Sequence, residues 1–155
     1  PDDTVGSLYF DKLFPLGVDA MAEAVALVKN GTAPRLTQDE SGATYEGWCK
    51  AEDVVIDWKR PVAEVYNLIR GSDPSPGAGT TFGGNKIRFF RARRHDAGGG
   101  ETPGEVTAVS DEGFMLAANG GALFVRRVQP ESSRKLMAPE WADSVGLRPG
   151  ARFGG

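Results

Sequence analysis

The chain has 155 residues, of which 40% are hydrophobic and 25% charged, a composition typical of a globular protein of one or two small domains. Its net charge of −3 is uneven, because residues 1–57 hold eleven acids and four bases whereas residues 58–155 hold ten acids and fourteen bases. No apolar run approaches the roughly 18 residues of a membrane helix, and one cysteine with one histidine excludes an internal disulfide and a structural zinc site.

The first thirty residues predict two helices. Asp2-Asp3-Thr4 supplies N-cap residue types for a short helix over Val5–Phe14, which Pro15 is expected to end. A second helical pattern runs from Leu16 to Asn30, and a glycine follows it. Both helices have an apolar face but no strand beside them. That face must therefore be buried either on the later sheet or on a partner.

The next stretch, residues 32–53, loses periodicity and is rich in Pro, Gly, Ser, Asp and Glu. It predicts a linker that crosses a surface, with Tyr45 and Trp48 as anchors. Residues 54–58 form a short extended run. Pro61 then suits the first turn of a helix that reaches Arg70.

Beyond this helix the apolar pattern changes to a period of two, which predicts five short strands separated by glycine-rich turns. A flexible loop is expected over residues 96–101, and a last short helix over residues 139–145. The fold class is therefore α+β, with a small antiparallel OB-like β-barrel that is capped by the helix of residues 61–70. The predicted strands are Thr80 to Phe82, Asn85 to Ala92, Gly104 to Val109, Phe114 to Ala117 and Ala122 to Gln129.

No cluster of residues predicts catalysis, cofactor binding or metal binding in this chain. His95 beside Asp96 has no nucleophile near it in sequence, and Cys49 beside a lysine is weak evidence for a reactive thiol. The glycines at 98–100 lack the lysine and hydroxyl residue of a phosphate loop. A solvated charge run is the preferred interpretation of the acidic residues of the linker, which are Asp39, Glu40 and Glu46.

The basic run over residues 86–94 is the most informative local feature. Regular alternation would place Arg91 and Arg93 on the same face as Ile87 and Phe89, and would therefore divide the cations between two faces. An ordinary solvated strand competes with a polyanion-binding groove, and the sequence pI of 5.2 favours the solvated strand. The candidate nucleic-acid-binding residues are Lys86, Arg88, Arg91, Arg93, Arg94, Arg126 and Arg127.

Five segments of the chain, in order, match the pattern of a known family. The segments are Asp3-Thr4-Val5-Gly6-Ser7-Leu8-Tyr9, Asp39-Glu40-Ser41-Gly42-Ala43-Thr44-Tyr45, Ile56-Asp57-Trp58, Asn67-Leu68-Ile69-Arg70 and Pro76-Gly77-Ala78. Together they resemble the folate-dependent formyltransferase family, which includes methionyl-tRNA formyltransferase and the hydrolase portion of formyltetrahydrofolate dehydrogenase. The stretch Gly42-Ala43-Thr44-Tyr45-Glu46-Gly47 is most similar to the dehydrogenase branch. Gly79 and Lys59 depart from the family pattern, where a bulky aromatic and a Ser are common.

The resemblance implies that the chain starts just after the catalytic Asp loop of an upstream α/β formyltransferase domain. It then comprises the last two helices of that domain (1–31), a linker (32–53) and the OB-like C-terminal domain (54–155). The family's Asn, His and Asp have no counterpart here. The implied parent enzyme is cytoplasmic and uses 10-formyltetrahydrofolate as substrate, while this chain binds no cofactor and is expected to be inactive alone.

Three functions follow from these observations. The chain could support acceptor binding and pack on the catalytic domain of a formyltransferase, or belong to a 10-formyltetrahydrofolate hydrolase or dehydrogenase. It could instead be a stand-alone module that binds tRNA or another polyanion. Self-association through the exposed helix face around Met21, Val25 and Val28 is a further expectation.

Overall fold

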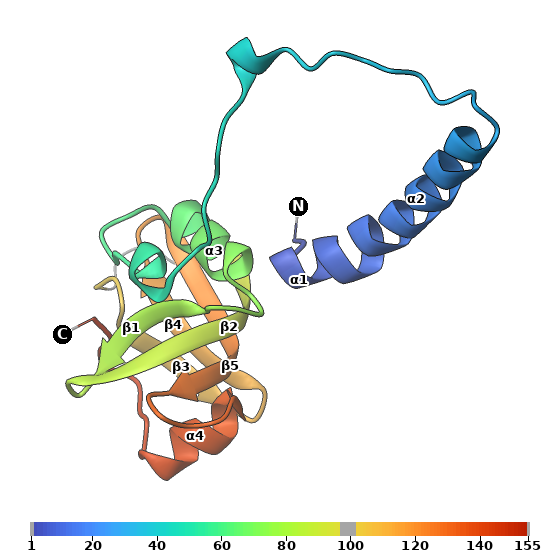
Figure 1. Ribbon diagram of the computed structural model, residues 1–155. Coiled ribbons are helices and arrows are strands. Elements are labelled where there is room, and N and C mark those ends of the chain that lie inside the picture. The colour runs from blue at the N-terminus through green and yellow to red at the C-terminus, as the bar shows by residue number, and fades with distance from the viewer. Residues whose placement is uncertain (1, 97–101, 155) are drawn as a thin grey trace. The chain divides into compact units, whose positions relative to one another are not determined.

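The computed structural model describes residues 2–96 and 102–154. They form two compact units (Figure 1). One unit is Gly6–Trp48, and the other joins the described residues up to Val5 with those from Cys49 onward. The loop expected at residues 96–101 falls, after its first residue, outside the described residues.

The N-terminal helical segment is less interrupted than the sequence predicted. A short helix α1 (Val5–Ser7) leads into a π-helical stretch η1 (Leu8–Leu13) and then into α2 (Phe14–Lys29). Pro15 was expected to end the first helix, and that prediction was wrong. The residue lies just after the π-helical stretch passes into α2, and the helical run continues through it. Gly31 follows α2 with a positive φ of 69°, as the glycine after a helix should.

The rest of this unit is extended chain around one 3₁₀ turn, η2 (Glu40–Gly42). Asp39 caps the turn by accepting hydrogen bonds from the backbone amide and the hydroxyl of Ser41, at 3.0 and 2.7 Å. The same two bonds hold the pKa of the Asp39 carboxyl below its usual value. Tyr45 and Trp48 were predicted as anchors, but their side chains are 90% and 93% exposed.

The other unit is built on a curled antiparallel sheet. The strand order is β1-β2-β5-β4-β3, and a sixth, two-residue strand pairs with β5. All five predicted strands are confirmed, because alternating apolar residues and glycine turns mark each of them. The strands are β1 (Ala78–Phe82), β2 (Asn85–His95), β3 (Val106–Ser110), β4 (Gly113–Ala118), β5 (Gly121–Pro130) and β6 (Leu136–Met137).

The C-terminal tail bridges the two outer strands of the sheet. Phe153 pairs with Phe82 at the end of β1, and Arg152 pairs with Glu105 just before β3. The amide of Val106 also donates to the carbonyl of Ala151 at 2.8 Å. The tail thus satisfies backbone groups on both edges and gives the sheet its barrel-like, OB-like form.

Helix α3 (Val62–Gly71) caps the barrel, as predicted, and buries Val65 and Ile69 against it. Its N-terminus has no side-chain cap; instead, the amide of Val62 donates to the carbonyl of Asn119 at 2.8 Å. A tertiary contact therefore satisfies this donor. Lys59 was expected to stand at the start of the helix in place of a capping Ser, but that prediction was wrong, because the N-cap residue is Pro61. The last helix, α4 (Ala138–Ser144), matches the prediction for residues 139–145.

Two local features differ from the sequence expectation. The extended run expected over residues 54–58 begins one residue later, because Val54 ends the 3₁₀ helix η3 (Ala51–Val54), and Val55 is extended and forms a single bridge with Gly79. Strand β6 was not predicted, since two residues are too short to show a period of two.

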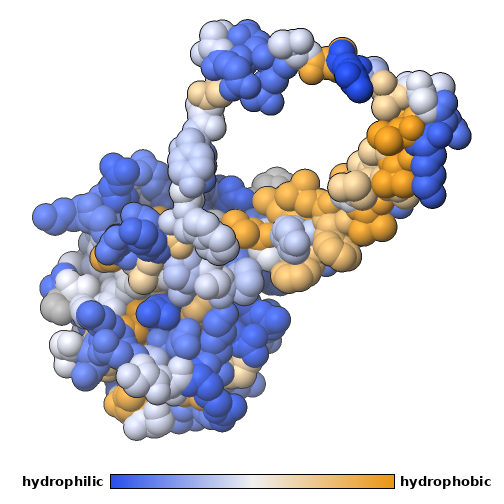
Figure 2. Space-filling model, in the orientation of Figure 1, coloured by the Kyte–Doolittle hydropathy of each residue, from blue (hydrophilic) through white to orange (hydrophobic). Residues whose placement is uncertain are grey.

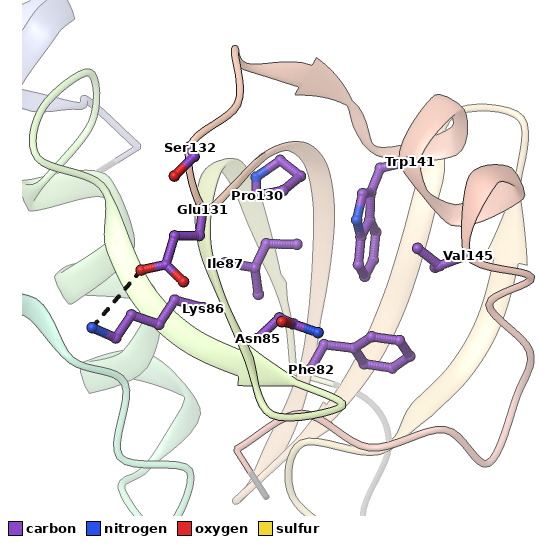
Figure 3. Close-up of a pocket in the computed structure, with 9 residues that line it drawn as sticks. All are labelled: Phe82, Asn85, Lys86, Ile87, Pro130, Glu131, Ser132, Trp141 and Val145. Carbon is purple, nitrogen blue, oxygen red and sulfur yellow. Dashed lines mark ion pairs between the residues drawn. The ribbon is translucent and has the colours of Figure 1, made fainter.

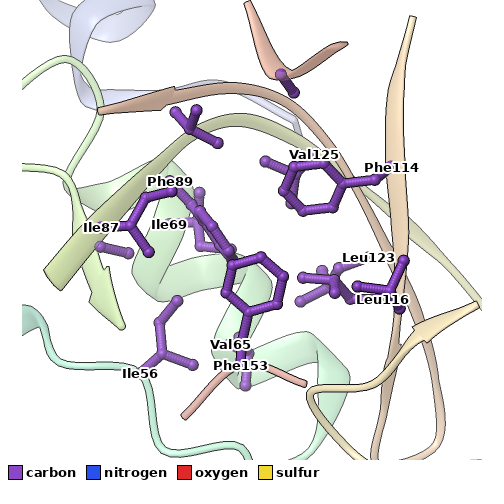
Figure 4. Packing of buried hydrophobic residues seen from close by; sticks show 14 of the residues in the cluster. Ile56, Val65, Ile69, Ile87, Phe89, Phe114, Leu116, Leu123, Val125 and Phe153 are labelled. Atoms are coloured by element: carbon purple, nitrogen blue, oxygen red, sulfur yellow. The ribbon is translucent and has the colours of Figure 1, made fainter. Parts of the chain in front are cut away.

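The core lies inside the curled sheet and is rich in aromatic rings (Figure 4). Phe89 and Phe114 are fully buried, and their centroids are 5.9 Å apart. Phe153, from the tail, packs between them at 5.2 and 5.5 Å, so that closure of the barrel and packing of the core depend on the same residue.

Candidate functional site

The alternation of side chains breaks once on each of two neighbouring strands. On β2, Phe89 and Ala92 both pack into the core although they are three residues apart. On β5 the core residues Val125 and Val128 have the same spacing, and the register pairs Ala92 with Val125 and Phe89 with Val128. Two consecutive residues of each strand therefore face outward at the same level of the sheet.

Those outward residues are Phe90 and Arg91 on β2 and Arg126 and Arg127 on β5. Arg91 has a positive φ of 49°, an uncommon conformation for a residue with a side chain. The carboxylate of Asp73 accepts a hydrogen bond from the Arg91 amide at 2.9 Å and holds the backbone there. The break explains why the prediction for this strand was wrong: Arg91 and Arg93 do not share the face of Ile87 and Phe89.

The break gathers cations around one hollow of about 330 Å³, lined by Arg91, Ala92, Arg93, Arg126 and Met137. Arg126 is paired with Glu112 at 3.1 Å. Among the described residues, no carboxylate partner is found for the guanidinium groups of Arg91 and Arg93. The hollow therefore has a positive charge that this part of the chain does not neutralise.

Phe90 packs beneath the charged side chains of this outer face. Its ring is buried but lies outside the barrel core, with the ammonium of Lys135 3.9 Å from its centroid. Lys135 also donates a hydrogen bond to the carbonyl of Pro74. Burial lowers the pKa of Lys135, as do the nearby charges of Arg127 and Arg91, while Asp73 opposes the shift.

Arg127 lies next to Arg126 and pairs with Met137 of β6. Its Nε is buried and has no hydrogen-bond acceptor among the described residues. Native structures pair the large majority of such donors. Sequence reasoning included Arg127 but missed Lys135, Asp73 and Met137, because contacts between segments far apart in sequence or strand pairing bring them to this face.

The other predicted cations lie elsewhere. Lys86 lines a second hollow, of about 400 Å³, whose wall is formed by Phe82, Ile87 and Trp141 (Figure 3). Its ammonium forms a 3.9 Å ion pair with Glu131 at the rim. Arg94 pairs with Asp96 at 2.9 Å. Arg88 is exposed and lines neither hollow.

The remaining polar candidates do not assemble into a reactive site. Asp96 binds Arg94, while His95 is exposed at the end of β2. Cys49 is also exposed. Within residues 2–96 and 102–154, no three acidic, His or Cys side chains come together as a metal site would need. Over the same residues, no helix has the length and hydropathy required to span a membrane.

Comparison with known proteins places these features in a family. Residues 49–146 match the formyl transferase C-terminal domain model. This chain is a member of that family. The match covers the six strands, α3 and α4 and thus both strands of the arginine hollow, but not the C-terminal tail from Leu147 onward.

Curated relatives extend the similarity to nearly the whole chain. Methionyl-tRNA formyltransferase of Symbiobacterium thermophilum is 40% identical over 155 residues, which are 99% of this chain and 47% of that protein. Cytosolic 10-formyltetrahydrofolate dehydrogenase of Mus musculus is 39% identical over 153 residues, 91% of this chain and 17% of that protein. The chain thus spans about half of the first relative and a smaller part of the second.

Solved structures agree on the fold. HypX of Aquifex aeolicus superposes with a TM-score of 0.81 at 20% identity, over 97% of this chain and 27% of that protein. A complex of HypX with tetrahydrofolic acid gives a TM-score of 0.78 over 92% of this chain. The α+β fold class, with helices and an antiparallel sheet, and the formyltransferase resemblance are therefore confirmed. In these longer proteins the matching region is attached to other domains.

Proposed function

We propose that this chain is the C-terminal part of an enzyme that uses 10-formyltetrahydrofolate, and that it supports acceptor binding and packs on an upstream catalytic domain. Family membership and the names of the curated relatives support the donor. The acceptor is an amine in a formyltransferase, or water in a hydrolase or dehydrogenase unit.

The observation that carries the proposal is the apolar surface of η1 and α2. None of the residues of these two elements, all of which the structure describes, is buried. Phe10, Met21 and Val28 are more than 60% exposed, and the apolar colouring of Figure 2 covers much of the visible helix surface. Such a patch marks a surface that another body covers. A catalytic domain encoded upstream is the partner that the family comparison favours.

The test compares this chain with the product of the complete gene. Met21→Ser and Val25→Ser should change the stability of the isolated chain by less than about 0.5 kcal/mol, because both side chains are already exposed. In the complete product the same substitutions should lower the thermal midpoint and the rate of 10-formyltetrahydrofolate consumption. Glu23→Gln, on the opposite side of α2, is the matched control and should change neither.

Equal, small effects in both proteins would contradict the proposed packing. Concentration-dependent dimerisation of the isolated chain, abolished by Met21→Ser, would instead assign the face to self-association. Parallel assays of the complete product with methionyl-tRNA and with water as acceptor then separate the two enzyme classes.

A tRNA acceptor can be tested at the arginine hollow, whose cations are candidate contacts for its phosphates. Contacts between tRNA phosphates and the three guanidinium groups would give a log–log salt slope of about −3. A gel shift of the complete product with tRNA between low and moderate salt measures it. A salt-independent shift, or none at low salt, would remove this acceptor.

A further inference from the structure

We infer that the hollow between β2 and β5 is a discrete binding site for a phosphoryl group, with Arg91, Arg93 and Arg126 as its ligands. The proposal does not rest on the formyl-transfer function or on an RNA acceptor. It rests on how the backbone places these three side chains.

The first argument is that the site is assembled from two strands. Arg91 and Arg126 occupy the outward positions created by the break in alternation, and Arg93 lies two residues beyond Arg91 on the same strand. A regular strand with Ile87 and Phe89 in the core would turn Arg91 and Arg93 inward. In this register Arg91 lies opposite Arg126, so the three side chains are neighbours on one face; the break turns that face outward, where an anion can reach it.

Local structure holds this arrangement in place. The left-handed backbone conformation is unfavourable for a residue with a side chain, and at Arg91 the Asp73 carboxylate stabilises it by accepting a hydrogen bond from the backbone amide. Phe90 is clamped by Lys135, which also binds the 73–77 loop through the Pro74 carbonyl. Strained backbone held by surrounding contacts is a feature of ligand-binding sites.

Charge gives the second argument. Among the described residues, Glu112 is the carboxylate that forms an ion pair with a guanidinium group of the hollow, at Arg126, while the Asp73 carboxylate binds the backbone amide of Arg91. Arg127, which follows Arg126, adds a further positive charge beside the hollow but does not line it. An anion with several acceptor oxygens would satisfy such a set of donors, and the planar fork of arginine suits a phosphoryl group.

The volume of the hollow indicates which kind of anion it can bind. The hollow, at about 330 Å³, is near the lower limit of about 300 Å³ for small-ligand sites. The other cations of β2 do not extend it, because Lys86 and Arg94 are each paired with a carboxylate and Lys86 lines a different hollow. The geometry thus favours one phosphate or pyrophosphate group over a run of backbone phosphates.

The experiment is a calorimetric titration of the chain with inorganic pyrophosphate at low salt. Arg91→Gln and Arg93→Gln should each weaken binding about 10-fold to 100-fold, the range expected for lost hydrogen bonds to a charged group. Arg88→Gln removes the same charge from the same strand outside the hollow and should leave affinity within about twofold. Thermal melts of each variant confirm that the barrel is intact.

Absence of pyrophosphate binding would overturn the proposal, because no site would then exist. Equal weakening of pyrophosphate binding by Arg88→Gln would also overturn it, because that result would show diffuse electrostatic attraction rather than a discrete site. A competition arm identifies the source of the phosphoryl group. Displacement of bound tRNA by pyrophosphate would support the same site with RNA as its source. Binding of tRNA that pyrophosphate and Arg91→Gln both leave unchanged would contradict a discrete site.

Discussion

Substitution of Gly77 by Ala tests how tightly the loop before β1 closes over the outer face. Gly77 has a φ of 86°, and a Cβ there would overlap the Cζ and Cε1 atoms of Phe90. The Phe90 ring is 1% exposed and is clamped by Lys135, so it has little room to rotate away. Two costs therefore add: about 1–2 kcal/mol for the left-handed backbone and about 1–3 kcal/mol for overpacking.

Gly83→Ala is the matched control, because Gly83 also has a positive φ, of 55°, but a Cβ there would have no neighbour within 4 Å. The free energy of unfolding of this variant should fall only by the cost of the left-handed backbone, about 1–2 kcal/mol. Urea unfolding followed by the fluorescence of the core tryptophans Trp58 and Trp141 measures both variants. A loss in Gly77→Ala no larger than that in Gly83→Ala would refute the packing argument.

Two hydrogen bonds give the remaining predictions. The Tyr66 hydroxyl donates a hydrogen bond to Asp2 at 2.9 Å, and burial, followed by this bond, raises the pKa of Tyr66. The contribution of Tyr66 to the free energy of unfolding is therefore present below pH 10 and is lost as the pH rises through the pKa of the folded state. Tyr66→Phe should remove that alkaline loss from melts at pH 8–11.5; an unchanged profile would contradict it. The indole N–H of Trp58 donates to Thr80 at 3.1 Å in the core. Trp58→Phe and Thr80→Val should each cost about 1–3 kcal/mol, and strict additivity in the double variant would argue against the bond.

Sequence reasoning located most of the barrel because its signals are local. Each strand from β1 to β5 has alternating apolar residues, and the hairpin turns have glycines, so residues near one another in the chain determine them. The helix after Pro61 is equally local. The one strand that was missed, β6, depends on pairing with β5 rather than on its own two residues.

The candidate site was predicted only as a set of cations. Strict alternation along β2 would point Arg91 and Arg93 toward the core. The breaks at residues 90–91 and 126–127 instead place both side chains on the exposed face. No single residue on β2 signals the break. It depends on Asp73, 18 residues away, and on the matching break in β5, and both are tertiary features.

The Pro76-Gly77-Ala78 segment, which carries part of the family resemblance, has a structural role that connects it to the arginine hollow. Ala78 is fully buried at the start of β1, and Gly77 leaves the space that the Phe90 ring occupies. Because Phe90 directly precedes Arg91, the contact that requires glycine also fixes the point where β2 leaves its regular alternation. A family segment that shows no catalytic chemistry can therefore determine where the cations of the outer face lie.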